Sequence, residues 1–233
     1  MGLIETAGAI ISRAQQRVEV SGQNMANMAT AGYKARRQFS DLIVDAGIDP
    51  QADAAPPRTF TDFTPGKLQN TGNPLDLALS GSGFFTVRSG DAMLYTRRGE
   101  FTRDAEGHLV TADGAMLQSE HGDLAVGAGS FAVLSDGTVV QGGQPSDRIA
   151  IADFADPAAL RPMGAEMFAA SSAASNSVAA PQIRQGMLET SNVSTADEML
   201  SVMAALRSAE AAQRMVQVYD DLMGRALTAF GQT

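Results

Sequence analysis

The feature that most constrains this chain is a pair of long helical patterns, one at each end of the sequence. Near the N-terminal end, apolar residues recur at alternating steps of three and four from Ile4 to Met28. The same pattern runs from Met199 to Leu227, and no proline occurs after Thr195. Such steps place side chains on one narrow stripe of an α-helix, as at the a and d positions of a coiled coil. We therefore predict a helix at each end of the chain, with the two packed together through coiled-coil-type contacts.

The two stripes are the candidate assembly surface. One helix pair buries only a thin strip of apolar surface, and helices in water are stabilised mostly by packing. We therefore expect the stripes to need neighbouring molecules, although they are equally compatible with the ordinary core of a helical layer. The candidate residues are Ile4, Ala7, Ile11, Ala14, Val18, Met25 and Met28 in the first helix, and Met199, Val202, Leu206, Val216, Met223 and Leu227 in the last.

The start of the last helix has the pattern of a capping box. In this pattern the hydroxyl of Thr195 accepts a hydrogen bond from the third amide of the helix, and the carboxylate of Glu198 accepts one from the amide of Thr195. We therefore expect the helix to begin at Thr195.

The centre of the chain has a different period. From Leu75 onward, apolar and polar residues alternate in short runs separated by turn sequences such as residues 104–107 and 135–137, which predicts a mainly antiparallel β region. The predicted fold class is α+β. The predicted segments are a helix at 1–33, an extended linker at 34–74, a β-domain at 75–168, a linker at 169–194 and a helix at 195–233.

Composition excludes several classes of protein. The chain has no cysteine, which excludes disulfides and thiolate metal sites. Its net charge of −9 argues against nucleic-acid binding. No apolar run is long enough to span a membrane, and the first residues lack the basic and continuously apolar regions of an ordinary secretory signal.

The sequence contains no recognisable catalytic, cofactor or metal site. His108 and His121 are the only histidines, and neither has a nearby second ligand. The Gly81-Ser-Gly83 stretch precedes a predicted strand, so it cannot present a helix N-terminus to a phosphate. Phe84 and Phe85 should face opposite sides of that strand, one into the core and the other toward an interface. We therefore predict no enzymatic activity.

Short motifs along nearly the whole chain resemble those of one family. They are the segments 24–27 (Asn-Met-Ala-Asn) and 30–34 (Thr-Ala-Gly-Tyr-Lys), the central block from residue 64 to residue 114, and the segment 185–193 before the last helix. Together, in this order, they resemble the bacterial flagellar rod and hook proteins, also called axial proteins. The motif residues are Asn24, Asn27, Gly32, Tyr33, Gly81, Gly83, Phe84, Phe85, Glu189, Ser191, Asn192 and Val193.

The resemblance implies a structural role in the rod of the flagellar basal body, the periplasmic drive shaft that transmits motor torque. It also implies export through the flagellar type III apparatus, and partners among the proximal and distal rod subunits. The first residues of the chain are more similar to a proximal-rod subunit, with a distal-rod or hook subunit as the alternative.

One alternative comes from another class of protein. The chain could be a surface β-domain, either a binding protein or an enzyme, with helical tethers. That interpretation requires a pocket with converging polar groups.

Overall fold

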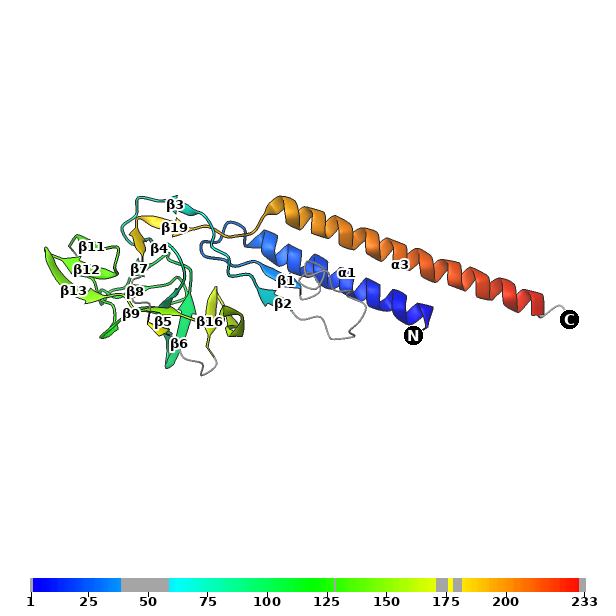
Figure 1. Ribbon diagram of the computed structural model, residues 1–233, viewed down its shortest axis with the longest axis horizontal. Coiled ribbons are helices and arrows are strands. Elements are labelled where there is room, and N and C mark those ends of the chain that lie inside the picture. The colour runs from blue at the N-terminus through cyan, green and yellow to red at the C-terminus, as the bar shows by residue number, and fades with distance from the viewer. Residues whose placement is uncertain (1, 39–58, 128, 171–175, 178–181, 231–233) are drawn as a thin grey trace. The chain divides into compact units, whose positions relative to one another are not determined.

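The computed structural model describes residues 2–38, 59–127, 129–170, 176–177 and 182–230 (Figure 1). The chain forms two compact units. The helical unit comprises residues 1–26, 36–60 and 193–233, and the β unit comprises residues 27–35 and 61–192. The α+β class and the mainly antiparallel central region are confirmed, while the predicted division into five segments stays a prediction.

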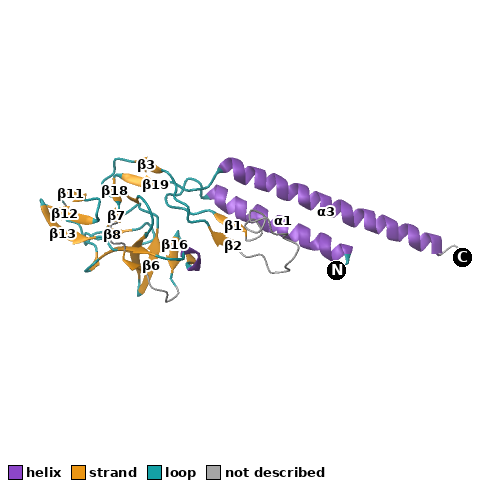
Figure 2. Ribbon diagram, in the orientation of Figure 1, coloured by secondary structure: helices purple, strands orange, loops and turns teal. Residues whose placement is uncertain are grey.

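The helical unit is built on two helices that run side by side in opposite directions. They are α1 (Leu3–Ala26) and α3 (Thr195–Phe230), and Figure 2 shows α3 continuing past the N-terminal end of α1. A two-stranded sheet of β1 (Arg36–Gln38) and β2 (Thr59–Thr61) completes the described part of this unit. Met28 lies beyond the end of α1, so the apolar stripe expected to reach it stops a turn earlier.

Small side chains make the buried contact between the helices. On α1, Ala7, Ala14 and Ser21 are buried and lie seven residues apart. On α3, Ala205 and Ala212 are buried at the same spacing. Seven residues are nearly two turns, so each set lies on one line along its helix.

The helix α3 begins at Thr195, as predicted, and Ser194 hydrogen-bonds to its first turn. The hydroxyl of Ser194 accepts a hydrogen bond from the amide of Asp197 at 3.5 Å, and its carbonyl accepts from the amide of Glu198 at 3.0 Å. Oε1 of Glu198 accepts a hydrogen bond from the side-chain amide of Asn24 in α1 at 2.8 Å. The chain therefore places two adjacent hydroxyl residues at the helix start, and the earlier one serves as N-cap.

The β unit consists of short strands joined by tight turns. Its strands are β3 (Leu68–Asn70), β4 (Leu77–Leu79), β5 (Phe84–Ser89), β6 (Ala92–Thr96), β7 (Thr102–Arg103), β8 (Leu109–Val110), β9 (Met116–Ser119), β10 (Gly122–Asp123), β11 (Phe131–Val133), β12 (Thr138–Gln141), β13 (Gln144–Arg148), β14 (Ile151–Asp153), β15 (Arg161–Gly164), β16 (Met167–Ala169), β17 (Asn176–Ser177), β18 (Ile183–Gln185) and β19 (Met187–Glu189), with a 3₁₀ turn η1 at Pro157–Ala159.

Antiparallel pairing organises these strands into one large sheet and three smaller ones. The ten-stranded sheet has the main order β15-β16-β6-β5-β9-β8-β7, and β14 also pairs with β5. A separate sheet has the order β11-β12-β13. The segment before α3 returns to the first strands of the unit, since β18 pairs with β4 and β19 with β3. Residues 183–189 therefore belong to the β unit as paired strands.

Two apolar clusters lie on opposite sides of β5. Phe85 belongs to the main core and meets Phe101 edge to face at 5.7 Å between ring centroids. Phe84 belongs to a second cluster, where its ring lies 5.4 Å from that of Phe63. Alternate residues of a strand point to opposite faces, as predicted for this pair. The expectation that one of the two faces an interface is wrong, because both side chains are buried.

Candidate functional site

Three segments that are far apart in the sequence meet at one buried carboxylate in the β unit. Glu189 ends β19 and is 1% exposed. Its Oε1 lies 2.6 Å from Nζ of Lys34, and its Oε2 lies 3.3 Å from Nη1 of Arg97. All three side chains are buried. A buried charge is tolerated only when it is paired and hydrogen-bonded, so each member of this cluster depends on the other two.

Backbone groups complete the cluster. Lys34 also donates to the carbonyl of Thr64 at 2.9 Å, and Arg97 donates to the carbonyl of Gly81 at 2.7 Å. The amide of Gly66 donates to Oε1 of Glu189 at 2.8 Å. Burial lowers the pKa of Lys34 and of Arg97, and the nearby Glu189 carboxylate opposes that effect in both. The carbonyl oxygens compensate the second positive charge, because one carboxylate faces two cations.

Two glycines let the backbone approach this cluster. Gly32 has a φ of +70°, and a Cβ there would lie 2.5 Å from the backbone carbon of Arg97. Its amide donates to the carbonyl of Glu189 at 2.7 Å. At Gly66 a Cβ would lie 1.9 Å from the carbonyl oxygen of Thr190. Only a residue without a side chain fits either position.

Asn192 joins the same strands a few residues later. Its side-chain oxygen accepts from the amide of Ala35 at 2.7 Å. Its nitrogen donates to the carbonyls of Asp62 at 2.8 Å and Thr64 at 3.0 Å. The motif of residues 189–193 thus fastens the chain segments after α1 and before α3 within the β unit.

Asn24 has the corresponding role in the helical unit. It is 1% exposed near the end of α1. Its side chain accepts from the amide of Arg36 at 2.9 Å, and donates to the carbonyl of Arg36 and to Oε1 of Glu198, both at 2.8 Å. One amide side chain therefore satisfies an edge of β1 and ties α1 to the first turn of α3.

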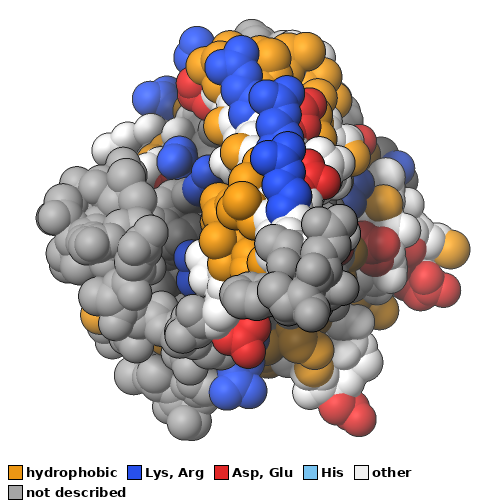
Figure 3. All heavy atoms as spheres, turned by 90° about the vertical axis from the view of Figure 1, so that its right-hand side faces the viewer, with side chains coloured by type: hydrophobic (Ala, Val, Ile, Leu, Met, Phe, Trp, Pro, Cys, Tyr) orange, Lys and Arg blue, Asp and Glu red, His pale blue; other side chains and the backbone are white. Residues whose placement is uncertain are grey.

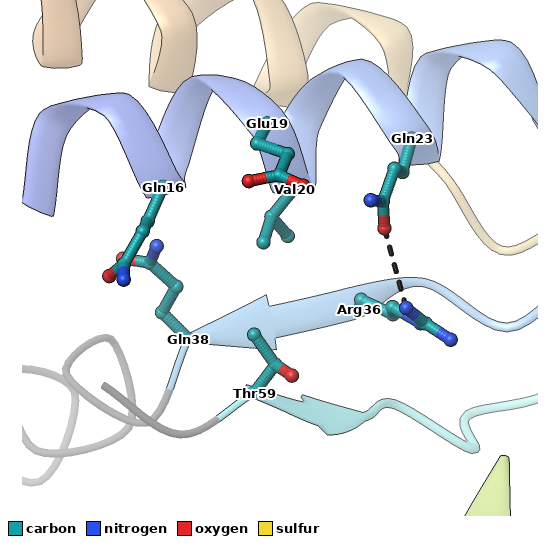
Figure 4. A pocket seen from close by; sticks show the side chains of 7 residues that line it. All are labelled: Gln16, Glu19, Val20, Gln23, Arg36, Gln38 and Thr59. Carbon is teal, nitrogen blue, oxygen red and sulfur yellow. Dashed lines mark hydrogen bonds between the residues drawn. The ribbon is translucent and has the colours of Figure 1, made fainter. Parts of the chain in front are cut away.

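An open pocket of about 200 Å³ lies between α1 and the small sheet (Figure 4). Within it, Nη1 of Arg36 donates to Oε1 of Gln23 at 3.3 Å. Its lining is mostly polar and consists of Gln16, Glu19, Val20 and Gln23 from one face of α1, with Arg36, Gln38 and Thr59 from the strands. The side chains that form it come from α1, β1 and β2 of one unit, and the bond between Arg36 and Gln23 attaches β1 to α1.

The predicted assembly residues differ in how far they are covered. Ala7 and Ala14 are buried between the helices. Ile11, Val18, Met25, Val202 and Val216 are half-buried, whereas Ile4, Met28, Met199, Leu206 and Met223 are exposed. Leu227 belongs to α3, but its side chain lies outside the described part of the structure.

The other motif residues serve the backbone or the core. Gly81 and Gly83 have positive φ values of 111° and 105° at the turn before β5. Tyr33 is buried, and Asn27 accepts from the hydroxyl of Thr30 at 3.4 Å. Ser191 and Val193 flank Asn192 and are half-buried.

Each histidine has an acidic neighbour. Nδ1 of His108 lies 3.2 Å from Asp104 within one turn, and Nδ1 of His121 lies 2.9 Å from Asp147. Within the described residues, no three His, Asp or Glu side chains come close enough together to hold a metal ion. Across the same residues, no helix is long and apolar enough to cross a membrane.

This arrangement is that of an architectural protein, in which motif residues join segments and do not surround a substrate. Residues 78–142 match the family described as the flagellar hook protein FlgE/F/G D1 domain, and residues 184–229 match the flagellar basal body rod FlgEFG protein C-terminal family. The chain belongs to the flagellar rod and hook protein family. It is a structural subunit of the flagellar basal-body rod and not an enzyme.

Named relatives include both FlgF and FlgG rod proteins. The flagellar basal-body rod protein FlgF of Caulobacter vibrioides is 31% identical over an alignment that covers 94% of this chain and 93% of the relative. FlgG of Agrobacterium fabrum is 28% identical and aligns with 89% of this chain and 91% of its own. FlgG of Borreliella burgdorferi is also 28% identical, over 97% of both chains.

The buried ion cluster was not predicted from the sequence, although its members lie inside the motifs. Lys34, Arg97 and Glu189 occur in three motif segments with no fixed spacing between them. The sequence signal for this cluster is that each of three apolar or turn-forming motifs contains a charged residue. That signal identifies candidates for burial, but it does not show that the three meet at one point.

Proposed function

We propose that the chain is a proximal-rod subunit that joins the rod through α1 and α3. The similarity to FlgF across 94% of the chain supports the proximal position. We further propose that it reaches the periplasm through the flagellar export apparatus and contacts the other proximal and distal rod subunits. FlgG relatives of similar identity make the distal rod the second candidate position.

The observation that carries this proposal is the exposed apolar surface of the helical unit. The fully buried apolar residues between α1 and α3 are alanines, which bury little area. Large apolar side chains remain outside it: Leu206 is 51% exposed and Leu222 is 59% exposed. Exposed apolar surface of this kind is typical of a protein that packs against neighbours.

We propose that the pair packs as an antiparallel coiled coil and that assembly continues this packing from copy to copy. The seven-residue spacing of Ala7, Ala14 and Ser21 and of Ala205 and Ala212 supports the coiled-coil geometry. The β unit has its own apolar core, so it folds without the neighbours that the helices need.

A charge in the exposed apolar surface tests the proposal. Leu206→Asp should abolish motility and incorporation into rods, because a carboxylate buried in an assembled interface without a partner costs several kcal/mol by order of magnitude. Arg214→Gln changes an exposed polar position on the same helix and should retain both. Motility in soft agar and the amount of chain in isolated basal bodies are the measurements. Normal rods with Leu206→Asp would contradict assembly through α3.

The position along the shaft needs a separate measurement. If the chain is proximal, cells lacking it should fail to add the distal rod, and a label on its β unit should appear near the cytoplasmic end of the shaft in images of basal bodies. A label near the hook would instead assign the chain to the distal rod.

A further inference from the structure

The helix α3 carries two exposed apolar patches on opposite flanks. The first patch consists of Met199, Met203 and Leu206, which are 49–54% exposed. The second consists of Met215, Val218 and Leu222, which are 38–59% exposed. Successive residues of an α-helix are rotated by about 100° around the helix axis. Measured around this axis from Ala205, which faces α1, the first patch lies about 100–160° to one side. The second lies about 80–140° to the other side.

A charged face separates the two patches. The side of α3 opposite Ala205 carries three arginines. At 3.6 residues per turn, the calculated directions of Arg207, Arg214 and Arg225 fall within about 20° of that side. Figure 3 shows a row of basic side chains with hydrophobic side chains on both sides. None of these three arginines has an ion-pair partner among the residues that the structure describes, and Asp221 shares their face. Burying such a face would cost desolvation energy, so we expect it to stay in water.

The patches are also displaced along the helix. Each residue of the first patch precedes its counterpart in the second by 15 or 16 residues: Met199 and Met215, Met203 and Val218, Leu206 and Leu222. At a rise of 1.5 Å per residue this displacement is about 24 Å. Two parallel copies of α3 bring unlike patches together only when one copy is shifted by about this distance.

We propose that the first patch of one copy packs on the second patch of the next, with parallel α3 helices staggered by about 24 Å. The inference rests on the proposed function, and it specifies which faces of α3 meet. Because the two patches lie on opposite flanks, the contact is heterologous and each copy leaves a free patch for the next one. The arginine face then remains the water-facing side of the array.

A second copy is the occupant that the structure favours. The first patch adjoins the surface of α3 that already packs on α1, so the new contact continues an existing interface. Methionine side chains adapt to irregular neighbours, so Met199 and Met203 of one copy can pack against the branched side chains of Val218 and Leu222 of the next. A two-fold contact would instead place each patch against its own copy and would close after two molecules.

Cysteine cross-linking tests the stagger, since the chain contains no cysteine of its own. The double variant Leu206→Cys/Leu222→Cys replaces the native chain in cells, and isolated basal bodies are treated with a mild oxidant. The two cysteines of one helix are about 24 Å apart, too far for a disulfide. We expect a ladder of disulfide-linked copies. The matched control is Leu206→Cys/Leu200→Cys. Position 200 lies on the same flank of α3 as Leu222, but without the displacement along the helix, so this variant should give monomers.

The outcomes separate this inference from the proposed function. A ladder from the control variant with none from Leu206→Cys/Leu222→Cys would overturn the stagger while leaving assembly through the helices intact. A cross-link from the Leu222 position to a different protein would overturn the second copy as occupant. Absence of the native chain from basal bodies would overturn the proposed function and this inference together.

The arginine face supplies an independent readout. The double variant Arg207→Glu/Arg214→Glu should still enter basal bodies and should give the same cross-linked ladder in the Leu206→Cys/Leu222→Cys background. Loss of assembly in this charge-reversed variant would show that the face lies inside a contact, and would overturn the assignment.

Discussion

The carboxylate of Glu189 compensates two cations in the interior of the β unit. Replacing it by alanine leaves Lys34 and Arg97 buried without a counter-charge. We expect Glu189→Ala to destabilise the β unit by about 3–5 kcal/mol, measured by urea unfolding of the purified chain. Glu106→Ala, at an exposed turn position, should change the free energy of unfolding by less than about 0.5 kcal/mol. Equal stabilities of the two variants would show that the cluster contributes nothing.

Gly32 and Gly72 form a matched pair for measuring a backbone clash. Both have a φ of +70°, but a Cβ at Gly72 meets no atom within 4 Å, whereas one at Gly32 meets the backbone of Arg97 at 2.5 Å. Gly72→Ala should cost about 1–2 kcal/mol from the left-handed conformation alone. Gly32→Ala should cost a further 1–3 kcal/mol or so from overpacking. Chemical unfolding of both variants measures the difference, and equal losses would contradict the close approach.

His121 should titrate above its ordinary range. The hydrogen bond and charge of Asp147 raise its pKa from the usual 6.5. A raised pKa means that the contact stabilises the folded chain at pH values below 6.5, and that this stabilisation is lost as the pH rises through the folded-state pKa. An NMR titration of the imidazole should show the raised value, and Asp147→Asn should return it toward 6.5. An unchanged midpoint in Asp147→Asn would remove Asp147 as the cause.

At the scale of the residue, the sequence identified which positions matter but not how they act. The motif analysis selected Asn24, Gly32 and Glu189. Several of their hydrogen bonds join positions far apart in the sequence: 155 residues separate Lys34 from Glu189, and 174 separate Asn24 from Glu198. Periodicity reports only neighbours within a few turns, so it could not predict these partners.

Among the elements, the contact between α1 and α3 depends on small side chains. Ala212 is fully buried, and its neighbour Ala211 is exposed. Ala212→Leu should destabilise the helical unit by about 1–3 kcal/mol through overpacking, seen as earlier loss of helical circular dichroism in urea. Ala211→Leu adds the same volume on the exposed side and should leave the transition within about 0.5 kcal/mol of the native chain. If both variants unfolded alike, the close contact at Ala212 would be wrong.

The elements themselves were largely predictable, because period and turn chemistry are local properties. Both ends of the chain form helices, and short strands follow Leu75, as the patterns predict. The side of each helix that faces the other was harder to predict from the sequence. Leu206 and Met199 were assigned to the packing stripe, yet the packing side passes through Ala205 and leaves these two larger residues exposed. Small residues occupy the packing side because they let the two helix axes come close.

For the whole molecule, the two units should differ in local stability before assembly. The β unit buries a large apolar cluster, whereas the helical unit buries mainly alanines between its helices. In dilute solution, amides of α3 should therefore exchange with deuterium sooner than those of β5 and β9. Assembled rods should protect them. Equal protection of α3 and β5 in the dilute chain would show that the helices do not need neighbours.

The pairing of Lys34 with Glu189 also sets the order in which the molecule can be completed. A polypeptide that emerges with its N-terminal end leading presents Lys34 and Arg97 long before their shared counter-ion appears. Until residues 183–189 are present, β3 and β4 lack their partner strands as well. The β unit can therefore be completed only when these residues, which follow nearly all of its other strands in the sequence, are present.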